Sequence, residues 1–281
     1  MKLSELINQG QSILKKSNNE NAKREAIIII KHVIKIKHYE IYLNPNKEIH
    51  YKSYSHILSL FKKRAKKIPI AYILNSKSFY KSEFYVDKNV LIPRPETEHI
   101  IDTTLNIINK NKKLQILDIG IGSGAILLTL LFNLPKSYGI GTDISINALK
   151  VAQKNLNNFK LHNRCHLINT NWAESLISNN FDLLVCNPPY IRSDDIKTLN
   201  KDITNFEPHI ALDGGKNGLE CLTQLLPSAR KCIKLNGSAL FEVGYDQSKE
   251  AQRLIMKNNF KINKIIKDFS GYNRIILTKA I

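Results

Sequence analysis

Residues 114–132 read LQILDIGIGSGAILLTLLF, a short apolar run, a glycine-rich turn and a longer apolar run. The first run has the length and composition of a buried strand, and the second has those of a helix packed on a sheet. Glycines at positions 120, 122 and 124 let the chain turn sharply and let its backbone lie against a ligand, where side chains would clash. This order predicts the first half of a βαβ unit.

Short apolar runs alternate with helical stretches from residue 113 to the end of the sequence, which favours a mainly parallel sheet covered by helices. The predicted strands are LQILDIG (114–120), YGIGTDI (138–144), CHLIN (165–169), DLLVCN (182–187) and SALFEVG (238–244), with FKINKIIKD (260–268) and RIILTKAI (274–281) completing the sheet. Helices are predicted around 124–133, 145–158 and 217–234. The fold class is therefore α/β.

The N-terminal part of the chain has a different texture. Apolar residues recur there at helical spacing, for example in a helix through Ile57 and Leu60 for which Ser53 is the predicted cap. From 75 to 95 the pattern loosens into short strands or a hairpin, and the IPRP segment interrupts regular structure. Three regions follow: a helical domain at 1–74, a linker with a hairpin at 75–95, and the α/β domain at 96–281.

Composition bounds the class of protein. With 281 residues, 43% of them hydrophobic, the chain can bury a large core without metal ions or disulfides. Its four cysteines form no C-x-x-C pair, so we expect reduced thiols and no metal site. The N-terminus lacks the apolar segment of a signal peptide, and no run approaches the ~20 residues of a membrane span, so a cytoplasmic location without membrane contact is expected.

The formal net charge is +18 and it is unevenly distributed. Residues 1–90 carry 18 basic and 7 acidic side chains, whereas residues 91–281 carry 24 and 17. A basic face favours an acidic partner or nucleic acid through long-range attraction. The alternative is compositional, because the whole chain is rich in Lys, Asn and Ile.

The glycine-rich turn has the spacing G-x-G-x-G rather than the G-x-G-x-x-G of dinucleotide enzymes, which disfavours hydride transfer. Asp143 follows Gly124 by nineteen residues, at the end of a predicted strand, where a carboxylate can accept hydrogen bonds from ribose hydroxyls. Taken alone, Asp143 could equally cap the helix that follows it. The strand, turn, helix, strand and acid together predict a nucleoside site.

The stretch FDLLVCNPPYI, residues 181–191, ends a predicted strand with an asparagine and two prolines. Asn187 offers a side-chain carbonyl and Pro188 a backbone carbonyl, which together could grip both hydrogens of a planar NH2 group and aim its nitrogen at an electrophile. The prolines have no N–H to compete for these acceptors, and Tyr190 offers a flat face to the planar group. The alternative is a plain proline turn after a strand.

The segments DIGIGSGAI, GTDIS and NPPY in this order resemble a class I methyltransferase that uses S-adenosylmethionine. Longer segments narrow the resemblance to the peptide chain release factor N5-glutamine methyltransferases: PIAYIL (69–74), LIPRPETE (91–98), FDLLVCNPPYI (181–191), FEPHIALDGGKNGLE (206–220) and FEVGYDQ (241–247). The match runs from residue 69 to the end, and the helices before it resemble the family's small helical domain in pattern. The resemblance implies a Rossmann-like seven-stranded sheet.

The resemblance also implies the reaction and its site. A methyl group would pass from S-adenosylmethionine, leaving S-adenosylhomocysteine, to the glutamine of the Gly-Gly-Gln loop in class I release factors, which act in translation termination. The implied cofactor residues are Gly120, Ile121, Gly122, Ser123, Gly124, Asp143, Asn171, Trp172 and Asn187. The implied substrate residues are Asn187, Pro188, Pro189 and Tyr190, of which Asn187, Pro188 and Tyr190 are the candidate catalytic residues.

The sequence departs from the family pattern at three positions. Asn171 stands where an aspartate is expected and would accept less strongly from the adenine amino group. Ile121 stands where threonine is usual, and Cys186, where serine is common, is interpreted as a packing residue. Arg94 and Glu96 are expected near the site without an assigned chemical step, and the segment from Glu207 to Gly215 is expected to shape a loop there.

Other functions stay open at this point. Glutamine methylation of a ribosomal protein is the nearest, and the PETE form of residues 95–98 favours release factors over it. Adenine N6 methylation of DNA or RNA would suit the basic charge. A nucleoside-binding regulatory domain would not need the NPPY turn. The basic helical domain is expected to help dock the release factor, with a weak contact to ribosomal RNA as a further possibility.

Overall fold

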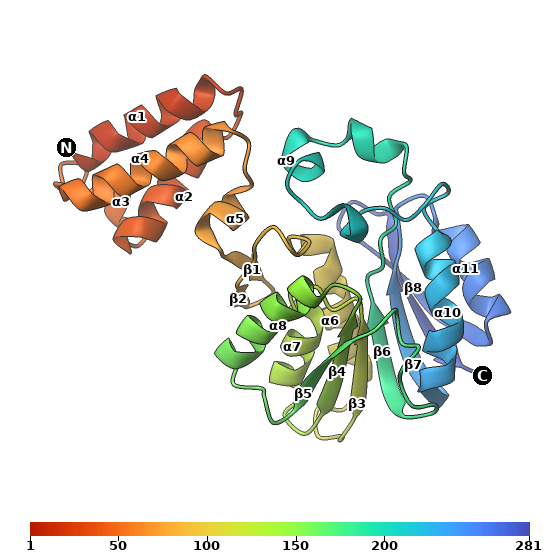
Figure 1. Cartoon of the computed structure of the whole chain (residues 1–281). Coiled ribbons are helices and arrows are strands. Elements are labelled where there is room, and N and C mark those ends of the chain that lie inside the picture. Colours follow the sequence, from red (N-terminus) through yellow and green to blue (C-terminus); the bar gives the residue numbers. More distant parts are fainter. The chain divides into compact units, whose positions relative to one another are not determined.

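The computed structural model describes all 281 residues, which form two units (Figure 1). The smaller unit comprises Met1–Asn75 together with Asn200–Phe206, and the larger comprises Ser76–Leu199 with Glu207–Ile281. The predicted linker at 75–95 is therefore part of the larger unit from Ser76 onward. The inclusion of Asn200–Phe206 in the smaller unit was not predicted.

The smaller unit is a set of helices around one apolar core. Its helices are α1 (Leu3–Lys15), α2 (Ala22–Ile34), α3 (Glu40–Leu43), α4 (Tyr51–Ala65), α5 (Ile70–Leu74) and α9 (Lys201–Thr204). The apolar stripes of α1, α2 and α4 face one another, with Leu6, Ile30 and Phe61 fully buried. Gly10 lets α1 approach α4 closely, because a Cβ at this position would overlap the ring of Phe61 on α4.

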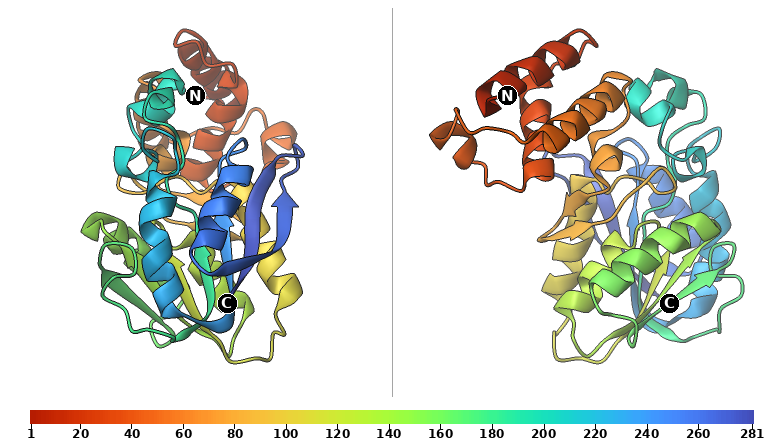
Figure 2. Two further views of the ribbon diagram at one scale, coloured as in Figure 1. Left: turned by 90° about the vertical axis from the view of Figure 1, so that its right-hand side faces the viewer. Right: turned by 60° about the vertical axis from the view of Figure 1, so that its left-hand side comes forward.

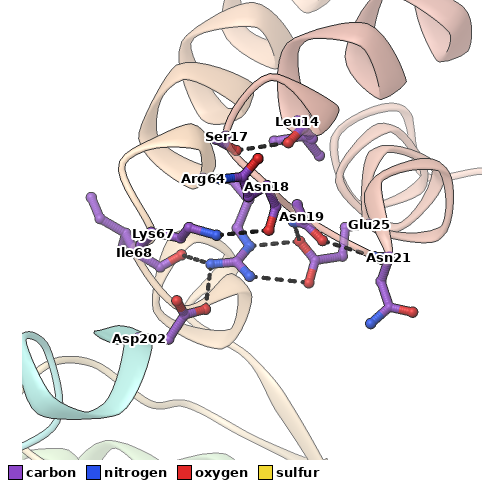
Figure 3. Close-up of polar contacts among 10 residues, drawn as sticks. All are labelled: Leu14, Ser17, Asn18, Asn19, Asn21, Glu25, Arg64, Lys67, Ile68 and Asp202. Carbon is purple, nitrogen blue, oxygen red and sulfur yellow. Dashed lines mark hydrogen bonds and ion pairs between the residues drawn. The ribbon is translucent and has the colours of Figure 1, made fainter. Parts of the chain in front are cut away.

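A charged cluster around Arg64 joins three helices of this unit (Figure 3). The guanidinium of Arg64 on α4 donates from Nε to Glu25 on α2 at 2.5 Å and from Nη1 to Asp202 on α9 at 2.6 Å. A further bond from Nη1 reaches the carbonyl oxygen of Ile68 at 3.1 Å. Arg64 is only 7% exposed, so its charge depends on these partners rather than on water.

The larger unit contains a two-stranded hairpin and a seven-stranded sheet. Its strands are β1 (Lys77–Phe79), β2 (Ser82–Phe84), β3 (Gln115–Ile119), β4 (Tyr138–Asp143), β5 (Cys165–Asn169), β6 (Phe181–Cys186), β7 (Ile233–Glu242), β8 (Phe260–Lys267) and β9 (Asn273–Ala280). Its helices are η1 (Pro95–Thr97), α6 (Glu98–Ile107), α7 (Ala125–Asn133), α8 (Ile146–Asn158), η2 (Asp195–Thr198), η3 (His209–Ala211), α10 (Glu220–Cys232) and α11 (Ser248–Lys257). The predicted seven strands are all confirmed.

The large sheet has the order β5-β4-β3-β6-β7-β9-β8, in which β9 pairs antiparallel with both of its neighbours and the other pairs are parallel. Helices α6, α7 and α8 cover one face, and α10 and α11 cover the other (Figure 1, Figure 2). Successive strand residues therefore point into two different cores: Leu183 packs with the first set of helices and Leu184 with the second.

The strand order places a binding crevice at the carboxyl ends of β3 and β6. Strands β4 and β5 extend from one side of β3, and β6 and β7 from the other, so β3 and β6 are neighbours at the point where the order reverses. Their register pairs Ile119 with Cys186. The glycine-rich turn and the NPPY turn therefore leave the sheet side by side.

The predicted cap of α4 was wrong, and the alternative interpretation of Asp143 as the cap of α8 is excluded. Helix α4 begins at Tyr51, and its cap is His50, whose Nδ1 accepts a hydrogen bond from the backbone N–H of Lys52. Ser53 thus lies inside the helix. Helix α8 is capped by Ser145 rather than by Asp143, because the Ser145 hydroxyl accepts from the backbone N–H of Ala148. None of the helices combines the length and the apolar character needed to cross a lipid bilayer.

Candidate active site

In the larger unit, a cavity of about 520 Å³ opens at the carboxyl ends of strands β3 and β6. Its size is typical of small-molecule sites. The lining includes most of the predicted site residues, namely Gly120, Ile121, Gly122, Ser123, Asp143, Asn171, Trp172, Asn187, Pro188 and Pro189. Gly124 and Tyr190 are the two predicted site residues outside the lining.

The glycine-rich turn presents bare backbone to open space. Gly120 and Gly122 have φ angles of +75° and +54°, and a Cβ on either would meet no atom within 4 Å. A ligand could therefore lie directly on this backbone. Gly124, with φ of +84°, has another function, because a Cβ there would press against Leu128 at 2.8 Å. It supplies the left-handed backbone conformation of the residue that precedes α7, at a place where a side chain would crowd Leu128 of that helix.

Asp143 ends β4 with its carboxylate tied to the same turn. Oδ2 accepts from the backbone N–H of Gly122 at 3.0 Å, and Oδ1 accepts from that of Ser145 at 2.9 Å. Burial raises the pKa of Asp143, and these two backbone bonds oppose the rise. Each carboxylate oxygen can accept a second hydrogen bond, so the group can still take ribose hydroxyls.

Asn171 and Trp172 follow β5 and border the same cavity. The amide nitrogen of Asn171 donates to Glu174 at 2.8 Å, which leaves its oxygen available to accept from an amino group. Trp172 has a φ of +45°, an uncommon conformation for a bulky residue, and its indole N–H is buried without a hydrogen-bond partner. Both side chains keep polar capacity that the chain itself does not use.

Ile121, where the resemblance predicts threonine, lines the cavity and packs its side chain against Gly141 of β4. Ile121 is 5% exposed, and its side chain occupies the space over Gly141 that a Cβ there would need. Its backbone N–H donates to the carbonyl oxygen of Thr142 at 2.8 Å. The substitution therefore changes contacts behind the turn and leaves the exposed backbone in place.

The NPPY turn carries two free acceptors. The side-chain nitrogen of Asn187 donates to the hydroxyl of Thr97 at 3.2 Å, which turns the amide oxygen away from Thr97. No donor of the chain reaches that oxygen or the carbonyl oxygen of Pro188. Both residues line the cavity, so their oxygens are available to an N–H of a ligand.

Tyr190, predicted to lie beside a planar substrate, is not among the residues that line the cavity. Its hydroxyl points to a buried carboxylate, with Oε1 of Glu242 at 3.5 Å. Burial and the charge of Glu242 raise the pKa of the Tyr190 hydroxyl, which therefore keeps its proton. In this structure the hydroxyl of Tyr190 links the NPPY turn to the end of β7.

Two of the segments that carry the family resemblance, 206–220 and 241–247, contact the NPPY turn and restrict its position. A Cβ at Gly214 would lie 2.7 Å from Cα of Tyr190 and 2.8 Å from the carbonyl oxygen of Pro189, so only glycine fits there. The side-chain nitrogen of Gln247 donates to the carbonyl oxygens of Tyr190 at 2.8 Å and Gly218 at 3.2 Å. These bonds leave the turn little freedom to move.

The segment 92–94 is tied to the loop that begins at Glu207. Arg94 donates to one oxygen of Glu207 at 2.7 Å, and the backbone N–H of Ile92 donates to the other at 3.1 Å. The Glu207 side chain is 1% exposed and that of Arg94 is 28% exposed, so a buried carboxylate pairs with a partly exposed guanidinium. Arg94 thus orders the wall of the cavity.

Two residues near the turn were missed by the sequence analysis, Thr97 and Glu242. Thr97 belongs to the quoted PETE segment, whose neighbours Arg94 and Glu96 were considered instead. Glu242 belongs to FEVGYDQ, where a carboxylate at the end of an apolar strand was the available signal. Cys186 matches its packing interpretation: its thiol donates to the carbonyl oxygen of Ile119, and burial raises its pKa well above the ordinary value.

Two family models match the chain. The PrmC N-terminal domain matches residues 5–74, and the methyltransferase small domain matches residues 101–214. A solved methyltransferase from Pyrococcus furiosus superposes with a TM-score of 0.53 at 18% identity, covering 83% of this chain and all of that one, which shows the fold.

Curated relatives cover both units. The release factor glutamine methyltransferase of Caulobacter vibrioides is 37% identical over 238 residues, 85% of this chain and 82% of the relative. The protein of the same name from Clostridium acetobutylicum is 32% identical over 99% of this chain and 98% of the relative. The resemblance stated from the sequence is confirmed, and the chain belongs to the release factor glutamine methyltransferase family.

Proposed function

We propose that this protein transfers a methyl group from S-adenosylmethionine to the side-chain amide nitrogen of the glutamine in the Gly-Gly-Gln loop of class I release factors. The observation that carries the proposal is the pair of free acceptors at the NPPY turn, the oxygens of Asn187 and Pro188. The glycine-rich turn lies beside these acceptors at the carboxyl ends of β3 and β6, and its backbone at Gly120 and Gly122 faces open space.

The residues around the cavity fit the cofactor. The backbone at Gly120 and Gly122 would support its methionine part, Asp143 would accept from the ribose, and Asn171 with Trp172 would border the adenine. The oxygen of Asn171 remains free to accept from the adenine amino group. Bound S-adenosylmethionine supplies a methyl group on a positively charged sulfur, an electrophile that needs no further activation.

The NPPY turn would prepare the nucleophile. An amide nitrogen is a weak nucleophile because its lone pair is delocalised, so its position and orientation decide the rate. Two acceptors on a rigid turn would hold both hydrogens of the substrate NH2 group and stop the amide from rotating. Positioning of this kind supplies on the order of 7–11 kcal/mol in favourable systems. The methylated nitrogen would then lose its extra proton to water.

The helical unit would help dock the release factor. Residues 1–75 carry 15 basic and 5 acidic side chains, an excess that favours acidic partner surfaces. The same charge would support a weak contact with ribosomal RNA. Binding measured over a series of salt concentrations separates the two, because phosphate contacts give a steep linear dependence of log K on log salt.

The test of the function is transfer of label. The protein is incubated with S-adenosylmethionine labelled in its methyl group and, separately, with intact release factor, release factor whose loop glutamine is changed to glutamate, ribosomal protein, DNA and RNA. We expect label on the intact release factor and none on the glutamate variant. Label on nucleic acid or ribosomal protein, with an unlabelled release factor, would overturn the proposal.

A further inference from the structure

Three aromatic side chains are exposed at the same end of the sheet as the NPPY turn. Phe269 is 92% exposed, Tyr245 is 59% exposed and Tyr272 is 51% exposed. Phe269 and Tyr272 lie on the turn between β8 and β9, and Tyr245 lies just after β7, which is parallel to β6 and pairs with the start of β9. We call these three residues the aromatic rim. Exposed apolar groups gathered in one place indicate an interaction surface, whereas single ones do not.

The turn that carries Phe269 is held by hydrogen bonds to one side chain. The carboxylate of Asp268 accepts from the backbone N–H groups of Ser270 at 2.9 Å and Tyr272 at 3.0 Å. A third bond comes from Nε of Arg274 at 3.1 Å. Phe269 is therefore presented to solvent on a well-bonded turn, so little conformational entropy is lost when a partner covers its ring.

Phe269 is connected to the NPPY turn through the start of α6. Its ring lies against that of His99, with the ring centroids 4.6 Å apart. His99 is two residues from Thr97, whose hydroxyl accepts from the side chain of Asn187. Phe269 therefore contacts the helix start that supplies Thr97 to the cavity lining, and it is not part of that lining itself.

The two tyrosines are connected to the NPPY turn through the residues after β7. The rings of Tyr245 and Tyr272 pack edge to face, with their centroids 5.5 Å apart. Gln247, two residues after Tyr245, donates to the carbonyl oxygen of Tyr190 at 2.8 Å. The aromatic rim is therefore continuous with the turn that would hold the substrate amide.

The arginines beside the aromatic rim have acidic partners. Arg192 pairs with Asp246 at 2.7 Å, and Arg274 pairs with Asp268 at 3.1 Å. Nucleic-acid binding depends on cations that neutralise phosphates, and these two arginines already have carboxylates beside them. An apolar protein surface makes no such demand, so the rim fits a protein partner better than a nucleic acid.

We propose that the aromatic rim is a docking surface for the release factor, which deepens the proposed function and rests on it. A protein substrate must lie over the surface around the cavity when its loop enters, and a stable interface covers about 800 Å² on each partner. Aromatic side chains commonly supply much of the affinity of such interfaces. The rim would hold an apolar patch of the release factor beside its Gly-Gly-Gln loop.

The first test measures label transfer by the full-length protein over a range of release factor concentrations. We expect Phe269→Ala to lower kcat/KM for the release factor about tenfold, with the KM for S-adenosylmethionine within twofold, because the rim holds the substrate and not the cofactor. Phe269→Tyr should stay within threefold. The matched control is Phe132→Ala, which should equal the wild type, since Phe132 is 62% exposed and lies at the end of α7, toward the amino ends of the strands.

The second test detects direct contact. Phe269 is replaced in the full-length protein by the photoreactive amino acid p-benzoylphenylalanine, and the protein is irradiated with release factor and S-adenosylhomocysteine. We expect crosslinks to release factor residues outside the Gly-Gly-Gln loop, identified by mass spectrometry. The same amino acid at position 132 should give none.

The outcomes separate the two proposals. A kcat/KM for Phe269→Ala within threefold of the wild type, or no crosslink from position 269, would overturn the docking inference and leave the proposed function standing. Loss of RNA binding or of self-association in Phe269→Ala, with unchanged transfer to the release factor, would overturn it in favour of that other partner. A wild-type protein that transfers no label to the release factor would overturn the proposed function and the docking inference with it.

Discussion

Loss of the Arg64 guanidinium should destabilise the helical unit selectively. We take Arg64→Met as the perturbation, because methionine keeps much of the length and none of the donors. Glu25 would keep a single side-chain donor, Asn19 at 2.6 Å, and Asp202 would lose its ion-pair partner. Breaking a buried ion pair on one side costs about 3–5 kcal/mol.

The low end of that range applies here. The Glu25 side chain is 16% exposed and that of Asp202 is 30% exposed, so water can partly replace the lost donors. We therefore expect a loss of about 3 kcal/mol in the free energy of unfolding of this unit. At 1.4 kcal/mol per tenfold, this corresponds to about a hundredfold loss of hydrogen-exchange protection.

Hydrogen exchange followed by mass spectrometry on the full-length protein is the assay. Peptides from α2 and α4 should lose protection, while peptides from β3 and β6 should not. Asp202→Asn should loosen only Asn200–Phe206, because Glu25 still pairs with Arg64. Arg24→Met, which removes an exposed arginine next to Glu25, is the control. A loss below threefold in α2 and α4, or an equal loss in the sheet, would refute this reasoning.

Three further changes test the larger unit. Asn187→Ala should abolish methyl transfer and leave cofactor affinity, measured by calorimetry, within about tenfold, and wild-type turnover would contradict the acceptor role. Gly214→Ala should lower kcat at least about tenfold, because its Cβ meets the backbone of Tyr190 and Pro189; unchanged kinetics would show that the turn can shift. Burial raises the pKa of Asp118 from 3.8 to about 7, so the folded state binds this proton more tightly and stability falls as the pH rises between these values. Asp118→Asn should therefore be more stable than the wild type by about 1–4 kcal/mol at pH 8.5, and this difference should shrink as the pH falls and vanish below about pH 4, with denaturant unfolding as the measurement.

The sheet could be predicted because each strand is recognisable from its own residues. The strand β6, for example, is an apolar run bounded by turn residues. The glycine-rich turn and the NPPY turn were also predictable, since Gly122 and Pro188 restrict the backbone through their own chemistry. The caps at His50 and Ser145 were missed because several nearby polar residues could have served, and only the final backbone path selects one.

The contacts that pair distant residues could not be predicted. Nothing near Asn187 in the sequence indicates Thr97, ninety residues earlier, and nothing near Arg64 indicates Asp202. The orientation of Tyr190 toward Glu242 likewise depends on how β7 lies beside β6. A single sequence supplies the types of these residues, and the fold alone decides which ones meet.

The assignment of Asn200–Phe206 to the helical unit has a consequence for how this protein can be cut or recombined. The backbone passes from one unit to the other three times, after Asn75, Leu199 and Phe206. A truncation after Asn75 would therefore remove Asp202 from Arg64, and a catalytic fragment starting at Ser76 would carry α9 with Asp202 lacking its ion-pair partner. Exchange of the helical unit between relatives by a single crossover would mismatch this pair, so the two units are expected to be inherited and engineered together.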